Sequence, residues 1–284
     1  MRSIPFFDDH YPVRTVFTGK KDIHQCDGRD VPPDVEEFSA FMNMPLRRML
    51  FAKEAHSGSV CVVTEQDPEG GFVYTDETWS VKPPGGYDSV ITDIPEILLC
   101  LRTADCIPVF LYDPAGQVIA MAHSGWRGTC SGISVNTVCA MEKLFGTDPG
   151  QVIAAFGPCV CGNCYEVGPE LIEDFSKQFS ADERRIFFRP KGKDKYHLDV
   201  KGAVRTDLLR LGVKPENIYD TGICTYENDG FASYRRDGWA PPEKQMISGI
   251  ALKNENREKG GGKGKTYDQS LFVHVILFFY FPGK

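Results

Sequence analysis

Short apolar runs recur along the chain and predict the strands of a β-sheet. They are rich in Val, Ile, Leu and Phe, which is typical of strands buried inside a protein. The runs cover residues 13–18, 60–64, 97–101, 108–112, 118–122, 152–156 and 246–252. Residues 113–116, Asp-Pro-Ala-Gly, join two of these runs and predict a hairpin turn, so part of the sheet is expected to be antiparallel.

Four segments between these runs carry apolar residues at a helical spacing. Pro33 begins the first, the second covers residues 129–145, Pro169 begins the third, and Asp199 caps the fourth. Their apolar stripes are Val35, Phe38 and Met42; Ile133, Thr137, Met141, Leu144 and Phe145; Leu171, Ile172, Phe175 and Phe179; and Val204, Leu208 and Leu211. The sequence therefore predicts a mixed α/β or α+β fold, with helices packed on a partly antiparallel sheet.

The composition of the chain changes near residue 253. The segment N-E-N-R-E-K-G-G-G-K-G-K follows it and is typical of a flexible linker, and an apolar stretch ends the chain. We expect one catalytic domain over residues 1–253. Residues 254–284 are expected to be an appendage that docks on the protein's own surface or on a partner.

Charge and cysteine content limit the class of protein. The chain has 284 residues and a net charge of −7, which disfavours nucleic-acid or membrane binding through bulk charge. The longest apolar run, residues 271–281, is shorter than the ~18 residues that a membrane helix needs. Ten cysteines without a secretory signal favour the reducing cytoplasm, where cysteines serve as thiols, ligands or nucleophiles.

Two short segments, T-A-D-C-I-P-V-F and A-H-S-G-W-R-G-T, place Cys106 and His123 at the ends of neighbouring strands. A thiolate and an imidazole form either half of a metal site or a nucleophile–base pair. His56 stands in the same H-S-G context as His123, so three ligands with one open position would suit a catalytic Zn²⁺. Alternatively, these are a buried cysteine and hydrogen-bonded histidines with structural roles.

Other residues could bind substrate. Arg127 lies in G-W-R-G, and Arg235 and Arg236 lie in F-A-S-Y-R-R-D-G; arginines bind phosphate in a bidentate manner, although ordinary ion pairs are equally compatible. Three cysteines within G-P-C-V-C-G-N-C-Y-E-V-G suggest metal or redox chemistry, or else a tight loop before a helix. A second C-x-x-C is missing, which disfavours a closed zinc ribbon.

Several familiar metal signatures are missing from the sequence. It has six histidines but no H-x-H pair, which disfavours the paired imidazoles of a multicopper cluster. It has no H-E-x-x-H zinc helix, and the H-x-E half of the deaminase signature is missing although P-C and C-x-x-C are present.

Four blocks of the sequence, in this order, resemble the motifs of the YfiH-type family, also labelled laccase-domain or multicopper polyphenol oxidoreductase. D-S-V-I-T-D with L-R-T-A-D-C-I-P-V resembles its D-G-x-x-T…T-A-D-C-x-P-V block, and A-H-S-G-W-R-G-T resembles A-H-A-G-W-R-G. G-P-C-V-C-G-N-C-Y-E-V resembles G-P-x-I-x-x-C-C-Y-E-V, and C-T-Y-E-N-D-G-F-A-S-Y-R-R-D-G resembles C-T…F-F-S-Y-R-R-D-G. The resemblance covers roughly residues 10–253.

The resemblance implies an α/β sandwich and a zinc site made by His56, Cys106 and His123, through the family's Q-V-H-G, T-A-D-C and A-H-A-G-W motifs. It also implies phosphorolysis of adenosine, inosine and methylthioadenosine, and deamination of adenosine. The older label implies oxidation of phenols with copper.

We therefore expect a zinc-dependent purine nucleoside enzyme, a monomer or homodimer, whose partners are a nucleoside and phosphate. The expected catalytic residues are Cys106, His123 and Arg127, and the expected substrate- or phosphate-binding residues are Arg127, Cys164, Tyr165, Arg235 and Arg236. Three alternatives stay open: a copper polyphenol oxidase, a metal-free cysteine hydrolase with Cys106 as nucleophile and His123 as base, and a non-enzymatic interaction module.

Overall fold

The computed structural model describes residues 1–22, 33–44, 49–64, 86–238, 244–254 and 274–278. The elements in these ranges are α1 (Pro5–Asp8), β1 (Val13–Phe17), η1 (Lys20–Asp22), α2 (Pro33–Met42), β2 (Met49–Phe51), β3 (Val60–Thr64), β4 (Ser89–Thr92), β5 (Leu98–Thr103), β6 (Ile107–Asp113), β7 (Val118–Ser124), α3 (Trp126–Cys130), α4 (Ile133–Phe145), η3 (Pro149–Gln151), β8 (Ile153–Phe156), β9 (Glu166–Val167), α5 (Glu170–Ser176), α6 (Ala181–Phe187), β10 (Phe188–Pro190), β11 (Tyr196–Leu198), α7 (Val200–Arg210), η4 (Pro215–Asn217), β12 (Ile218–Asp220), α8 (Tyr234–Asp237), β13 (Met246–Leu252) and β14 (His274–Phe278).

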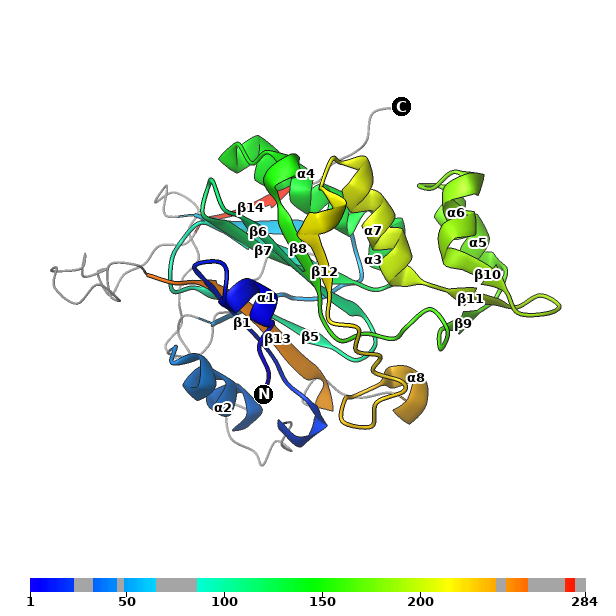
Figure 1. Ribbon diagram of the computed structural model, residues 1–284, viewed down its shortest axis with the longest axis horizontal. Helices are drawn as coiled ribbons and strands as arrows, with labels where there is room; N and C mark the ends of the chain where they lie inside the picture. Colours follow the sequence, from blue (N-terminus) through cyan, green and yellow to red (C-terminus); the bar gives the residue numbers. More distant parts are fainter. Residues whose placement is uncertain (23–32, 45–48, 65–85, 239–243, 255–273, 279–284) are drawn as a thin grey trace, which may run out of the picture.

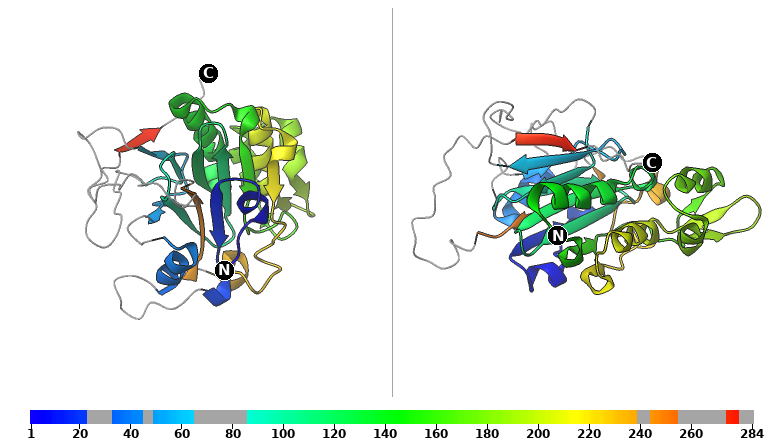
Figure 2. Two further views of the ribbon diagram at one scale, coloured as in Figure 1. Left: turned by 60° about the vertical axis from the view of Figure 1, so that its left-hand side comes forward. Right: turned by 90° about the horizontal axis from the view of Figure 1, so that it is seen from above.

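Two β-sheets packed face to face form the centre of the protein (Figure 1). Across the described ranges, the larger sheet has the strand order β12-β8-β6-β7-β4-β3-β14 and the smaller has β1-β13-β5-β2. Helices α3, α4 and α7 cover the outer face of the larger sheet, and α2 packs on the outer face of the smaller one (Figure 2). Both sheets contain parallel and antiparallel pairs, as the mixed fold class predicted.

The central strands are apolar throughout because both of their faces are covered. In β6, Val109 and Leu111 face the helices, whereas Phe110 and Tyr112 face the smaller sheet. This alternation follows from the two-residue period of a strand, and all residues of β6 and β7 are buried. The site described below therefore lies at the ends of two central strands of the larger sheet.

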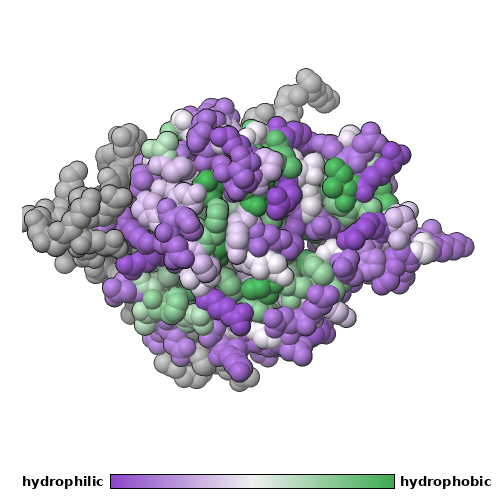
Figure 3. Space-filling view, viewed as in Figure 1, coloured by the Kyte–Doolittle hydropathy of each residue, from purple (hydrophilic) through white to green (hydrophobic). Residues whose placement is uncertain are grey.

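A smaller lobe projects from one end of the molecule, made by the sheet β10-β11-β9 with α5 and α6 (Figure 1). Its core is a cluster of aromatic rings, with Phe179 and Phe187 centroids 5.0 Å apart and Phe175 and Phe188 centroids 5.3 Å apart. In contrast to these apolar cores, the face of the whole molecule shown in Figure 3 is mostly hydrophilic, with smaller apolar areas among the hydrophilic ones.

The seven predicted strands are confirmed, and the turn at residues 113–116 joins β6 and β7 as an antiparallel pair. The prediction of one helix over residues 129–145 is wrong in detail. The segment forms two helices, α3 and α4, that meet at Gly132, whose φ of 69° lies in the left-handed region and interrupts the first helix. The predicted cap is confirmed: the Asp199 side chain accepts a hydrogen bond from Gly202 N at the start of α7.

Part of the C-terminal segment joins the larger sheet. Strand β14 pairs antiparallel with β3, from His274 opposite Thr64 to Phe278 opposite Val60. The predicted linker lies outside the described residues, except for its first position, Asn254. None of the helices in the described ranges combines the length and apolar character needed to cross a membrane.

Asp207 on α7 is a buried carboxyl whose ionisation opposes folding. It accepts hydrogen bonds from Gln178 Nε2 at 2.9 and 3.1 Å and from Arg210 Nη2 at 2.6 Å. Burial raises its pKa from the ordinary 3.8 to about 7, against the attraction of Arg210 and with a small addition from Glu183. Because the pKa is higher in the folded state, this group favours folding at low pH, and that contribution is lost as pH rises from 3.8 towards 7.

We expect Asp207→Asn, which cannot ionise, to remove this dependence. The free energy of unfolding of the variant should fall less steeply over that pH interval than that of the wild type, by up to ~1.4 kcal/mol per pH unit. Urea unfolding at a series of pH values measures the slopes, with the exposed Asp182→Asn as control. Equal slopes for Asp207→Asn and wild type would contradict the prediction.

Candidate metal centre and cavity

Three residues with metal-binding side chains meet at one end of the larger sheet. The ligand atoms of His56, Cys106 and His123 all lie within 4.8 Å of one another. Cys106 directly precedes β6 and His123 lies near the end of β7, opposite Pro108 in the antiparallel register. The start of one strand is therefore beside the end of the other. His56 comes from the loop that precedes β3.

The backbone around these residues is shaped to bring them close. His56 has a φ of 55°, in the left-handed region that non-glycine residues seldom adopt. A Cβ atom at Gly125 would lie only 2.7 Å from Cys106 Sγ and 3.5 Å from the His56 ring. Glycine at this position therefore leaves the space in which the thiol and the imidazole meet.

A buried carboxylate, Asp88, holds the two histidines. Its Oδ1 lies 2.9 Å from His123 Nδ1 and accepts a 2.9 Å hydrogen bond from His56 N. It also accepts hydrogen bonds from Ala55 N, Ser57 N and Ser57 Oγ. Since the carboxylate occupies Nδ1 of His123, the Nε2 atom is the one left to face Cys106, an arrangement typical of histidine ligands to metals.

Charge coupling within the cluster favours an ionised thiol. Burial opposes ionisation of Cys106, but the charge on His123 and the hydrogen bonds with His123 and His56 outweigh it and lower the pKa of Cys106 to about 7. Burial likewise opposes the charged form of His123, but the Cys106 charge and the bond to Asp88 raise its pKa well above the usual range. The thiolate is the form that binds metals or attacks electrophiles.

These three residues line a cavity of about 390 Å³. Its wall also contains Arg127 and Arg235, each stacked on an aromatic ring. The Arg127 guanidinium carbon lies 4.2 Å from the Trp126 ring centre, and that of Arg235 lies 4.9 Å from the Tyr165 ring centre. Of the residues expected to bind substrate, Arg127, Tyr165 and Arg235 therefore line the same cavity as His56, Cys106 and His123.

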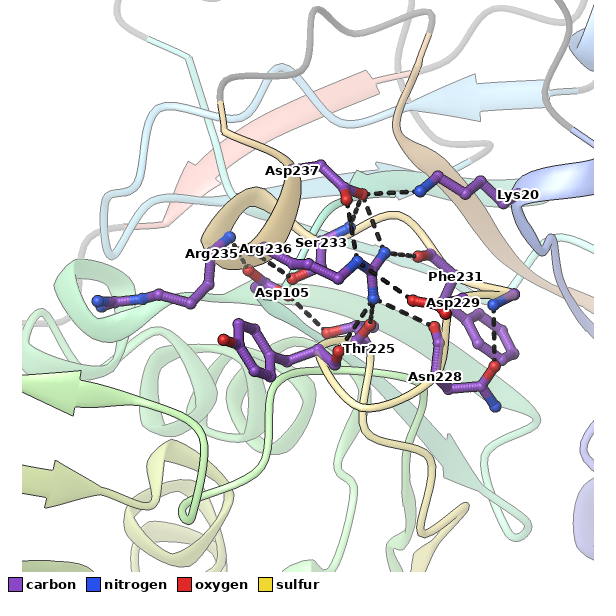
Figure 4. A network of polar contacts seen from close by, with 12 residues as sticks. Lys20, Asp105, Thr225, Asn228, Asp229, Phe231, Ser233, Arg235, Arg236 and Asp237 are labelled. Atoms are coloured by element: carbon purple, nitrogen blue, oxygen red, sulfur yellow. Dashed lines mark hydrogen bonds and ion pairs between the residues drawn. The ribbon is translucent and has the colours of Figure 1, made fainter.

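The neighbouring arginine, Arg236, does not line the cavity but lies among the polar groups of a nearby loop (Figure 4). Its guanidinium donates to the carbonyl oxygens of Thr225, Tyr226 and Phe231 at 2.6–3.0 Å and pairs with Asp237. Figure 4 shows its side chain pointing away from that of Arg235. The structure does not bring Arg236 to the cavity, and these bonds instead hold the loop after Cys224 together.

Cys164, also expected near the substrate, belongs to a second group. Its thiol donates to Glu227 Oε1 at 3.3 Å, and Cys161 and Cys224 complete the group. The ligand atoms of these four residues also lie within 4.8 Å of one another. This group shares no residue with the first.

Two acidic residues of the site were missed in the sequence. Asp88 was visible only as part of D-S-V-I-T-D, and nothing local indicated its contact with His123. Glu54 lines the cavity, and Arg102 N donates to its Oε1 at 2.7 Å. Burial raises the pKa of Glu54 despite the positive charge of His123. Glu54 stands two residues before His56, where the family's Q-V-H-G motif has Gln. This match was the one sequence signal that could have identified Glu54 as part of the site.

The residues present fit a metal ion. Two imidazoles and one thiolate are a zinc donor set, and catalytic zinc sites characteristically use three protein ligands and keep a position open. The Asp88–His123 bond and the space left by Gly125 suit such a site. Copper also accepts imidazole and thiolate ligands, so the donors by themselves indicate a metal without identifying it.

Comparison with known proteins agrees with this fold. Residues 24–253 match the family model described as multi-copper polyphenol oxidoreductase laccase. A purine nucleoside phosphorylase of Bacteroides thetaiotaomicron is 42% identical over 168 residues, covering 59% of this chain and 61% of that protein. Purine nucleoside phosphorylase YlmD of Bacillus subtilis is 30% identical over 244 residues, 85% of this chain and 84% of the relative.

A further relative and a solved structure are also similar to this chain. Adenosine deaminase RL5, from an unknown prokaryotic organism, is 32% identical over 199 residues, 69% of this chain and 73% of that protein. The crystal structure of YfiH from Bacillus licheniformis has a TM-score of 0.70 at 25% identity, covering 85% of this chain and 93% of the other. The fold and site define a mixed α/β protein with a histidine–cysteine group that could hold a metal ion. The chain belongs to the YfiH-type, laccase-domain family.

We expect Asp88→Asn to weaken metal binding by the His56–Cys106–His123 group. An amide cannot accept all the hydrogen bonds of the carboxylate, and loss of such a partner to a histidine ligand costs about 10–100-fold in metal affinity. Competition with a chromophoric chelator measures the affinity for zinc. Asp207→Asn, at a buried carboxyl outside both groups, is the control, and unchanged affinity in Asp88→Asn would contradict the assigned role.

Proposed function

We propose that this chain is a zinc-dependent purine nucleoside enzyme that cleaves adenosine, inosine and methylthioadenosine with phosphate and deaminates adenosine. The observation that carries the proposal is the shared cavity: His56, Cys106 and His123 line it together with two arginines. The names of the relatives, purine nucleoside phosphorylase and adenosine deaminase, support this choice of substrate class.

The two arginines suit the phosphate co-substrate. A guanidinium that stacks on an aromatic ring through its face keeps the N–H groups on its edge for a ligand. Arg235 uses Nη2 to bind Glu166 O at 2.9 Å, which fixes the side chain and leaves further donors. Arg127 and Arg235 would neutralise the phosphate and orient it towards the ribose.

The rest of the cavity suits a nucleoside. Trp126 and Tyr165 offer aromatic surface for a purine ring, and Ile107, Val160 and Val200 add apolar wall. A volume of about 390 Å³ lies within the usual range for small-molecule sites. Glu54 adds a half-buried carboxyl that could donate a hydrogen bond to the base or accept one from it.

Different residues of the chain would hold the metal and position the phosphate in the two reactions. His56, Cys106 and His123 would hold the zinc, and Asp88 keeps the His123 ring in the orientation that binding requires. A zinc ion so held supplies a Lewis acid and an activated water for deamination. The arginines position phosphate for attack on the ribose carbon, a bimolecular step that gains from fixed orientation.

Arg127→Met should separate the two activities. It removes a charged partner of phosphate, so the KM for phosphate in inosine cleavage should rise about 10–100-fold. Deamination of adenosine in phosphate-free buffer should change much less. Chromatography of products, with inosine, hypoxanthine, adenine and ribose 1-phosphate as standards, measures both reactions.

Two further variants complete this experiment. Arg185→Met removes an exposed arginine on α6 and should leave both activities unchanged. Cys106→Ala should abolish both reactions. The proposal fails if zinc-loaded wild type forms none of these products, or if Cys106→Ala remains as active as wild type.

A metal-free cysteine hydrolase is the second candidate, and one observation favours it. Cys106, His123 and Asp88 form a thiol–imidazole–carboxylate series, the arrangement of a nucleophile, its base and the group that orients the base. Iodoacetamide labelling distinguishes the candidates. A zinc enzyme should be protected at Cys106 by zinc, whereas a hydrolase should be active without metal and lose activity in proportion to labelling.

Copper oxidation of phenols stays an alternative because of the family label. Among the described residues, the two groups of potential ligands contain two histidines in total, His56 and His123. Metal analysis of protein produced with ample copper and zinc decides the point: zinc alone supports the nucleoside proposal, and copper with phenol oxidation would replace it.

A further inference from the structure

The second group of potential ligands is built from two matching turns. Cys161 and Cys164 are separated by Gly-Asn, and Cys224 and Glu227 are separated by Thr-Tyr, giving C-x-x-C opposite C-x-x-E. The four ligand atoms lie within 4.8 Å of one another. The sequence lacks a second C-x-x-C, but the fold places a carboxylate where its second cysteine would be.

Hydrogen bonds fix each turn in a form that directs its side chains to one point. Cys164 N and Tyr165 N donate to Cys161 O at 3.0 and 3.2 Å, and Asn228 N donates to Cys224 O at 3.1 Å. Cys161 N donates to Cys224 Sγ at 3.3 Å, across the two turns. This bond fixes the Cys224 sulfur against the first turn.

Neighbouring backbone bonds hold the two turns together. Cys159 N donates to Ile223 O at 3.3 Å, and Thr225 N donates to Cys159 O at 3.0 Å. The chain thus holds these four side chains close together.

We propose that Cys161, Cys164, Cys224 and Glu227 bind a second metal ion, a thiophilic divalent cation such as Zn²⁺. Three thiolates and one carboxylate complete the four ligands of a closed tetrahedral site, the pattern of structural rather than catalytic zinc. Cys224 is buried and Glu227 is exposed, so the ion would reach its site from the surface. The proposal is independent of the reaction carried out in the cavity.

Such an ion would clamp two loops that shape the cavity wall. The first loop carries Val160 and Tyr165, which line the cavity. The second carries Thr225, which hydrogen-bonds Asp105, the residue before Cys106, at 2.6 Å. The second ion would therefore support the site from outside without touching the substrate.

The test is the zinc content of the full chain, purified under reducing conditions and equilibrated with zinc. Wild type should hold two ions per chain, and Cys106→Ala and Cys224→Ser should each hold one. The double variant should hold none. Cys139→Ser, at a cysteine outside both groups, should hold two.

Two measurements do not depend on the cysteine variants folding. Titration of wild type with Co²⁺ should fill two sites, one of which gives the stronger thiolate-to-cobalt absorption of three sulfur ligands. Glu227→Gln, at an exposed position, should weaken one zinc site at least tenfold and leave the other unchanged. A single ion per chain in wild type that Cys224→Ser retains, two ions in folded Cys224→Ser, or a Cys161–Cys164 disulfide in the reduced protein would overturn the proposal.

Discussion

The arrangement of the His56–Cys106–His123 group depends on the buried carboxylate of Asp88. This carboxylate is fully buried and accepts hydrogen bonds from three successive backbone N–H groups, those of Ala55, His56 and Ser57, and from the His123 ring. A buried charge must be satisfied, so the loop has to curl around it. That curl places His56 in its left-handed conformation, and the same carboxylate sets the His123 ring. One carboxylate thus positions both histidines.

Much of this arrangement could be predicted from the sequence, for definite physical reasons. The apolar runs identified β6 and β7 because both faces of these strands are buried. The turn at residues 113–116 then requires Cys106 and His123 to lie at the same end. The break at Gly132 was missed because the apolar stripe continues across it. Asp88 could not be identified either, since its partners lie on a loop distant in the sequence.

The two adjacent arginines show another limit of local patterns. Arg235 and Arg236 are neighbours on the short helix α8, and both suited an anion site by residue type. In the structure one stacks on Tyr165 at the cavity, whereas the other donates to the loop carbonyls of Thr225 and Phe231. Successive residues of a helix project in different directions, so at most one of them can face a given point. Which one does so is decided by how the helix docks, which is a tertiary contact.

Asp105 connects these parts into one unit. Its φ of 89° is strained for a residue with a side chain, at a cost of about 1–3 kcal/mol, and persists only if its surroundings enforce it. They do: Asp105 accepts hydrogen bonds from Thr225 Oγ1 and Arg235 N at 2.6 Å each, and its carbonyl accepts one from Val160 N at 3.0 Å. These partners come from the loop of the second cysteine group, the arginine helix and the cavity wall. Because Asp105 is bonded directly to Cys106, the position of the thiol is set by elements outside the His56–Cys106–His123 group. Movement of the loops at residues 157–168 or 223–228 would break these hydrogen bonds and let the Asp105 backbone relax. The position of Cys106 would then change.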